Sequence, residues 1–171
     1  MFAMKLYTKI SLIILIPLFA GLTSCIKEDQ YPVVPHIEFA GYGIYSAVDG
    51  TDSACNITFS YTDGDGDIGL TKADSLEPYK YNFYLKLMQL VDGHMVEVVL
   101  PSDSITFNAR IPMLTPTGRN KNIKGEITMN FDLYFNSYLL QSNTIGFETY
   151  IVDRALNKSN IVTTPNLTIV R

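Results

Sequence analysis

The chain has 171 residues, of which 47% are hydrophobic and 18% charged, and its formal net charge is −4. This length predicts one domain with a core of its own, and the acidic balance argues against a nucleic-acid-binding protein, because such proteins carry a basic surplus. The two cysteines are too few for the disulfide framework of a small secreted scaffold.

The first residues are typical of an export signal. Lys5 and Lys9 supply positive charge, and residues 10–20 form an apolar run. That run is shorter than the roughly 20 apolar residues that a membrane-spanning helix requires. We therefore predict that residues 1–24 are a signal peptide.

The signal ends in the sequence LTSC, residues 22–25, which resembles a bacterial lipobox. The resemblance implies cleavage before Cys25 and acylation of that residue, whereas the alternative is an ordinary secretory signal with a chance cysteine. The next residues, IKEDQ, resemble the export tag of cell-surface lipoproteins in the Bacteroidota, carried here by Lys27, Glu28 and Asp29. The expected location is the outer membrane, with the lipid-anchored protein facing the cell surface; the alternative is a lipoprotein that faces the periplasm.

Residues 25–36 read as an acidic, proline-containing tether, since proline favours an extended backbone. Beyond it, apolar residues recur with period two, which is typical of half-buried strands. The alternation is clearest in 125–135 and 105–111, while 83–91 and 94–100 read as a hairpin around Asp92 and Gly93. Further strands are expected near 37–44, 55–62, 145–153 and 161–170. The fold class predicted for 37–171 is all-β, as a single immunoglobulin-like antiparallel β-sandwich of about 7–8 strands.

The segment YIVDRALNKSN, residues 150–160, resembles the last hairpin of bacterial immunoglobulin-like and fibronectin-like repeats, although Leu156 stands where glycine is usual. Together with the lipobox, the stretch YTDGDGDIGL at 61–70 and the loop at 110–127, the chain resembles a family of Bacteroidota outer-membrane lipoproteins. This resemblance implies a compartment and a fold, and no activity.

The stretch DGDGD places Asp63, Asp65 and Asp67 on alternate residues, with glycines between them that allow sharp turns. Calcium takes six to eight oxygen ligands, and carboxylates at this spacing can converge on one ion. The loop is not an EF-hand, because its sixth position is Ile68 and not glycine. A metal site therefore needs a distant ligand, for which Asp153 at a strand end is the candidate. The alternative is a solvated turn in which only the apolar residues after it enter the core.

Catalytic constellations are poorly represented. His36 and His94 lie outside the segments predicted to be buried, and Cys55 leads an alternating strand, which favours a buried apolar role. No spacing typical of a zinc site or of a phosphate-binding loop occurs. We therefore expect a protein that is not an enzyme.

Two features suggest contact with partners. The loop at 112–124 concentrates the cations Arg119, Lys121 and Lys124 on an acidic chain, so it is a candidate for binding an anionic glycan, lipid headgroup or acidic protein, or is only a solvated crossover. Three Asp-Ser-apolar triplets resemble Bacteroidota O-glycosylation sites and lie in predicted loops. Their acceptors would be Ser53, Ser75 and Ser104.

The sum of these features predicts a non-enzymatic, lipid-anchored cell-envelope module that acts by binding, as an accessory subunit of an outer-membrane protein complex. The alternative is a glycan-binding surface lipoprotein for polysaccharide capture, since 11 tyrosines could supply sugar contacts. Calcium is the only cofactor expected.

Overall fold

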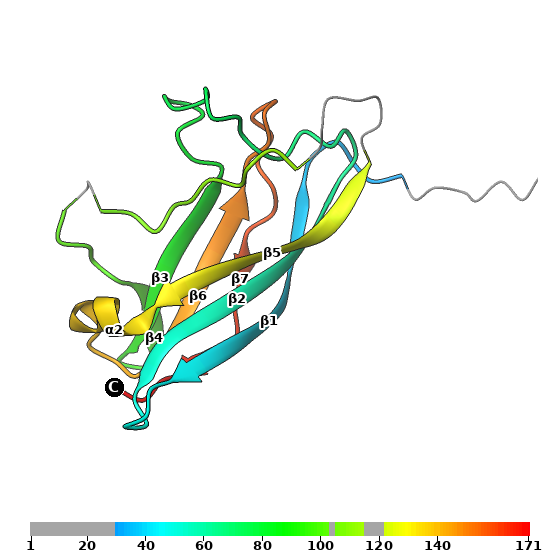
Figure 1. Ribbon diagram of the computed structural model, residues 1–171. Coiled ribbons are helices and arrows are strands. Elements are labelled where there is room, and N and C mark those ends of the chain that lie inside the picture. The colour runs from blue at the N-terminus through cyan, green and yellow to red at the C-terminus, as the bar shows by residue number, and fades with distance from the viewer. Residues whose placement is uncertain (1–29, 103–104, 115–121) are drawn as a thin grey trace, which may run out of the picture.

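The structure, a computed structural model, describes residues 30–102, 105–114 and 122–171. These residues form two antiparallel sheets that pack face to face (Figure 1). The predicted all-β sandwich is therefore confirmed. Within these residues, no helix combines the length and the apolar character needed to cross a membrane.

The first sheet has the order β1-β2-β5, and the second has the order β4-β3-β6-β7 with β8 also paired to β6. The strands are β1 (His36–Ser46), β2 (Asp52–Asp63), β3 (Phe83–Val91), β4 (His94–Glu97), β5 (Ile123–Asp132), β6 (Thr144–Ile151), β7 (Val162–Thr163) and β8 (Leu167–Thr168). Strands that are distant in the chain become neighbours, β2 with β5 and β3 with β6. This crossing between sheets is typical of immunoglobulin-like sandwiches.

The core lies between the sheets and is filled by the alternate residues that the period-two pattern predicts. Aromatic rings join the layers: the Phe59 and Phe83 rings lie 6.1 Å apart, and the Phe131 and Phe147 rings 5.2 Å apart. Edge-to-face and tilted ring pairs at these distances add to the hydrophobic term. Cys55 is fully buried, as its place in the alternation predicts.

The β3–β4 hairpin is confirmed. Asp92 and Gly93 adopt positive φ values of 49° and 80°, as a two-residue type I′ turn requires. His94 opens β4 and is exposed.

The strand predicted at 105–111 is not formed. The described residues of this region make only isolated bridges, Ala109 with Phe83 and Pro112 with Leu70. Side-chain amides replace the expected ladder: Asn108 Oδ1 accepts a hydrogen bond from the Leu85 N–H at 3.1 Å. Of the predicted inward face, Phe107 and Ala109 are partly buried and Ile111 is buried, but Ile105 is 41% exposed, and the backbone partners of this region differ from those of a strand.

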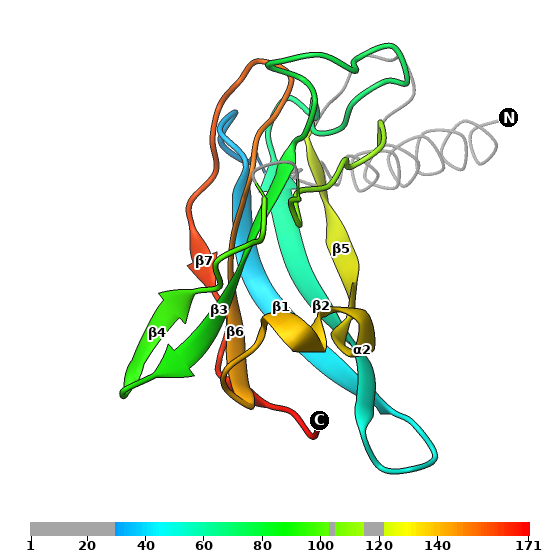
Figure 2. The same ribbon diagram turned by 90° about the vertical axis from the view of Figure 1, so that its left-hand side faces the viewer.

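The strand predicted at 125–135 also ends early. Its carboxyl end forms the short helix α2 (Leu133–Asn136), followed by the 3₁₀ helix η1 (Ser137–Leu139). The Asp132 Oδ1 atom accepts a hydrogen bond from the Phe135 N–H at 2.7 Å, which is an N-cap interaction. Leu133 therefore enters the core while Phe135 is exposed. Figure 2 shows α2 in the half of the molecule that carries the β1–β2 turn.

Candidate metal centre

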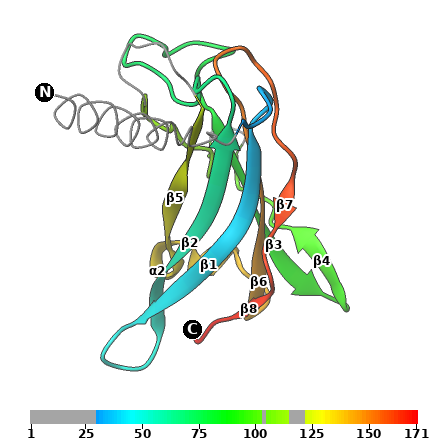
Figure 3. The same cartoon turned by 90° about the vertical axis from the view of Figure 1, so that its right-hand side faces the viewer.

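The acidic loop follows β2 in one sheet, and Asp153 follows β6 in the other. Both strand ends point to the same end of the sandwich, where β1 begins (Figures 1 and 3). One carboxylate oxygen from each of Asp63, Asp67 and Asp153 lies within 4.8 Å of the other two. The fold thus brings Asp153 to the loop, at the position that the sequence analysis proposed for a distant ligand.

The loop is folded around the Asp63 side chain. Its Oδ2 atom accepts hydrogen bonds from the backbone N–H groups of Asp67, at 2.9 Å, and Ile68, at 3.3 Å. Ile68 is fully buried and pulls the end of the loop into the core, while Gly66 supplies a φ of 64°. Asp63 is itself fully buried, while Gly64, Asp65 and Asp67 are partly buried, so this turn is not the fully solvated one of the alternative.

Three carboxylate oxygens of the loop lack a partner. The Oδ1 atoms of Asp63, Asp65 and Asp67 are buried, and no group of the described residues donates a hydrogen bond to them. Leaving a buried polar atom unsatisfied costs about 1–3 kcal/mol, and more for a charged group. Such orphaned acceptors are rare in folded proteins, and here they are concentrated in one loop.

The turn after β6 completes the site and holds Asp153 in place. The backbone N–H and the side-chain amide of Asn157 donate to the two Asp153 carboxylate oxygens at 2.7 and 2.8 Å. The Ala155 N–H donates to Asp67 Oδ2 at 3.0 Å, joining the turn to the loop. Leu156 adopts a φ of 68°, so leucine takes the left-handed conformation for which glycine is usual at this point.

The electrostatics of the cluster disfavour its fully charged form. Burial, and then the charge of Asp65, raise the pKa of Asp63 to about 6. Burial, followed by the charges of Asp153 and Asp65, also raises the pKa of Asp67, against a smaller opposing effect of Arg154. Both directions follow because desolvation and like charges penalise a carboxylate. A bound cation would remove this penalty.

The donor set fits a hard divalent cation. Ligands that lie 2.3–2.6 Å from one calcium ion are at most about 5 Å from each other, which agrees with the 4.8 Å limit of the triad. The triad contains only carboxylates and no histidine or cysteine, a chemistry that suits calcium or magnesium better than zinc or copper. The orphaned Asp65 Oδ1 is a candidate for a fourth ligand.

The other predicted site residues are distributed differently. Cys25, Lys27, Glu28 and Asp29 lie outside the described residues, as do Arg119, Lys121 and Ser104. Lys124 is described and is exposed on β5.

Of the candidate glycosylation sites, Ser75 is exposed in the loop between β2 and β3. Ser53 is not in a loop as predicted. It lies in β2, and its hydroxyl donates to the Tyr45 carbonyl at 2.9 Å. The β1–β2 connection is short, so the strand begins one residue before Ser53.

Two features of the surface were missed by the sequence analysis. Tyr134, Phe135 and Tyr138 are 80%, 71% and 65% exposed. The alternating pattern assigns Phe135 to the core, because such a pattern does not show that a helix cap turns the chain outward. The second feature is the hydrogen bond between Gly64 and Pro32. These residues are far apart in the sequence, so no local sequence pattern predicts their contact.

Comparisons with known proteins add no relative: the chain matches no family model, no curated protein and no solved structure. What the fold and the site define is an all-β sandwich with a cluster of three aspartates at one end, of which Asp63 and Asp153 are buried and Asp67 is partly buried.

Proposed function

We propose that this protein is a calcium-stiffened, lipid-anchored β-sandwich of the cell envelope, which acts by binding a partner and not by catalysis. The observation that carries the proposal is the buried aspartate cluster with its orphaned oxygens. A cation is the simplest group that satisfies all of them, because each unpartnered carboxylate oxygen has a free lone pair for it.

The choice of calcium rests on the ligands. Calcium accepts an irregular shell of six to eight oxygens, whereas magnesium demands near-ideal octahedral geometry and retains several waters. Asp63 is the last residue of β2, while Asp67 and Asp153 lie in irregular backbone outside the strands, and ligands from such different backbone settings favour the ion with the less demanding geometry.

The structural effect of the ion would be to link the two sheets. Asp63 ends β2 in one sheet, and Asp153 follows β6 in the other, so a shared ion ties them together. An ion that binds only the folded state stabilises it by about 2.7 kcal/mol at a concentration of 100 times Kd. The binding function would then depend on a rigid scaffold.

The location belongs to the same proposal. Its support is the sequence alone: the LTSC motif ending at Cys25 and the following Lys27, Glu28 and Asp29. We propose acylation of Cys25 and display at the outer membrane, with a protein complex as the partner.

The three exposed rings of α2 and η1 support a partner surface. Their segment is rigid, because Leu133 and Leu140 are buried and the Gln141 N–H donates to Gln89 Oε1 at 2.7 Å. Aromatic side chains are enriched among the residues that dominate interface energies. Residues 133–143 contain no charged side chain, and this observation favours, as a second candidate, a neutral glycan that stacks on the rings.

Calcium titration by calorimetry with matched thermal melts tests the proposal. Wild-type protein should bind one ion with Kd in the range of about 10⁻⁶ to 10⁻³ M, and binding should raise Tm. Asp153→Asn should lose both effects, whereas Asp92→Asn, at an exposed turn where asparagine tolerates positive φ, should retain both. Absence of heat and of a Tm shift in the wild type would contradict the calcium assignment.

The partner surface is tested separately by mild crosslinking in membranes. Wild-type protein should crosslink to a defined envelope protein, and Tyr134→Ser combined with Tyr138→Ser should weaken that product. An unchanged product would place the interface elsewhere, and recovery on a neutral glycan array in place of a crosslink would favour the second candidate.

A further inference from the structure

The chain enters the sandwich across the aspartate loop. The Gly64 N–H donates to the Pro32 carbonyl at 2.8 Å, and the Tyr31 N–H donates to Asn122 Oδ1 at 2.9 Å. The segment 31–35, which leads into β1, therefore lies against the loop that carries Asp63 and Asp65.

The approach at Gly64 leaves no room for a side chain. A Cβ atom at this position would lie 2.1 Å from the Tyr31 carbonyl oxygen and 2.8 Å from the Pro32 carbonyl carbon and oxygen. Gly64 stands between Asp63 and Asp65 in the chain, so the backbone that carries these two carboxylates also holds the entering chain. A movement of the loop must move this contact.

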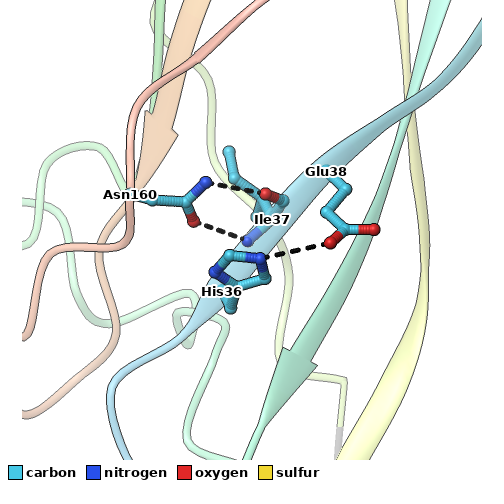
Figure 4. A network of polar contacts seen from close by, with 4 residues as sticks. All are labelled: His36, Ile37, Glu38 and Asn160. Carbon is cyan, nitrogen blue, oxygen red and sulfur yellow. Dashed lines mark hydrogen bonds and ion pairs between the residues drawn. The ribbon is translucent and has the colours of Figure 1, made fainter.

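The entering chain has a second attachment that is independent of the loop. Asn160 donates its side-chain amide to the Ile37 carbonyl at 2.8 Å and accepts from the Ile37 N–H at 2.9 Å (Figure 4). These two bonds hold the start of β1, whatever the state of the loop. Pro35 is buried beside this attachment, whereas residues 32–34 are exposed and depend on the contacts made by Tyr31 and Pro32.

A ligand for the loop is indicated by more than its acidity, since Asp63, a member of the cluster, is fully buried and its Oδ1 atom has no hydrogen-bond partner among the described residues. We propose that the cation held by Asp63, Asp67 and Asp153 fixes the direction in which the N-terminal segment leaves the sandwich. This inference rests on the calcium binding proposed above and names its consequence. Without the ion, repulsion among the carboxylates loosens the loop and releases Pro32, so that residues 31–34 swing about the buried Pro35.

The consequence is a calcium-dependent orientation of the module. Five residues lie between Cys25 and Tyr31, and a chain of that length spans about 20 Å at most from one Cα atom to the other. With so short a connection, the direction of residues 31–35 determines which face of the sandwich is turned toward the structure to which the N-terminus is attached. With calcium bound, the sandwich would be held in one orientation. Removal of calcium would allow many orientations.

Distance measurement between two spin labels tests this directly in the full chain carrying Cys25→Ser. The labels go on Val33→Cys, which is 53% exposed, and on Asn130→Cys, on the exposed face of β5. Cys55 does not compete, because it is fully buried. With calcium we expect one narrow distance distribution, and with a chelator a distribution at least twice as broad.

Two glycine variants distinguish the effect of ion binding from the effect of the contact between Gly64 and the entering chain. Gly64→Ala retains every carboxylate but collides with the Tyr31 carbonyl, so its distribution should stay broad in calcium. Gly41→Ala is the control, because a Cβ there meets nothing within 4 Å, and it should behave as wild type. If Gly64→Ala does not fold, Asn122→Ala removes the Tyr31 contact without changing the loop and should broaden the distribution in calcium.

Calorimetry on the same samples measures calcium binding, and so distinguishes a failure of this inference from a failure of the proposed calcium site. Calcium binding together with equal distance distributions in calcium and in chelator would overturn this inference and leave the calcium-stiffened module intact. A wild-type protein that binds no calcium would overturn both. Narrowing by calcium in wild type and Gly41→Ala, without narrowing in Gly64→Ala or Asn122→Ala, would establish the coupling.

Discussion

Asp92 and Gly93 connect β3 to β4 in the solvent, whereas the chain from Asp63 to Asp67 turns inside the end of the sandwich. Both stretches combine aspartate with glycine after a strand, and both contain residues with positive φ. The difference arises downstream, since Ile68 is fully buried after the aspartate loop while the short β4 returns along the sheet edge. Burial converts ordinary turn chemistry into a cluster of charges that needs a counterion.

The largest expected effect comes from a substitution of Ile68, the apolar residue that anchors the aspartate loop in the core. Ile68→Ala should lower the free energy of unfolding by about 2–5 kcal/mol, because it removes buried methylene groups and leaves a cavity. Val96→Ala, beside the exposed turn and 40% accessible, should cost less than about 1 kcal/mol. Urea unfolding measures both. A loss below 1 kcal/mol for Ile68→Ala would show that the loop does not depend on this anchor.

The second expected effect is a pH dependence that originates in the buried loop. The pKa of Asp63 is raised to about 6 in the folded protein, so between pH 4 and 6 the folded state binds more protons than the unfolded state. In chelator, the free energy of unfolding should therefore fall as pH rises through this window, by roughly 2–3 kcal/mol. Saturating calcium should abolish or reverse that slope, because the ion stabilises the ionised carboxylates. Chelator and calcium profiles of the same slope would contradict this account.

A smaller effect, of opposite sign in the two conditions, is expected for Asp63→Asn. The asparagine oxygen can still accept from the Asp67 and Ile68 N–H groups, and the substitution removes one charge from the cluster. In chelator at pH 7 it should raise stability by about 1–2 kcal/mol, whereas in calcium it should be less stable than wild type. Asp92→Asn should change neither value by more than about 0.5 kcal/mol. Thermal melts in both conditions are sufficient, and a variant destabilised in both would indicate that the charge of Asp63 is needed without an ion.

The smallest effect concerns the turn that positions Asp153. Leu156 holds a φ of 68°, which costs an L-residue about 1–2 kcal/mol relative to glycine. Leu156→Gly should raise the free energy of unfolding by up to about 1 kcal/mol, since part of the gain is lost to the greater freedom of glycine in the unfolded chain. Calorimetric calcium affinity should be unchanged. A weaker affinity would mean that the leucine side chain, and not only its backbone, supports the site.

Much of the fold follows from local patterns. Period-two alternation predicted the central strands, and the Asp92-Gly93 pair predicted the hairpin, because each depends on residues that are close in the chain. The prediction failed where a single side chain changed the hydrogen bonding: Asp132 caps a helix and ends β5, and Asn108 takes the place of a ladder partner at 105–111.

The candidate site was predictable to a similar degree. The spacing of the loop aspartates identified Asp63 and Asp67, and the strand-end position of Asp153 identified the distant member, but Asp65, also predicted as a ligand, is not in the triad. The burial of Asp63 was not predictable, because it depends on how Ile68 enters the core. The contact between Gly64 and Pro32 joins the loop to the entering chain through space, and the glycine by itself reads only as a turn residue.

The most direct test of the central claim is an anomalous difference map from a crystal grown with calcium. We predict a single peak among Asp63, Asp67 and Asp153, about 2.3–2.6 Å from a carboxylate oxygen of each. A cluster without a peak at saturating calcium, with its carboxylates bonded to ordered water alone, would contradict the account and return the loop to the status of a buried acidic turn.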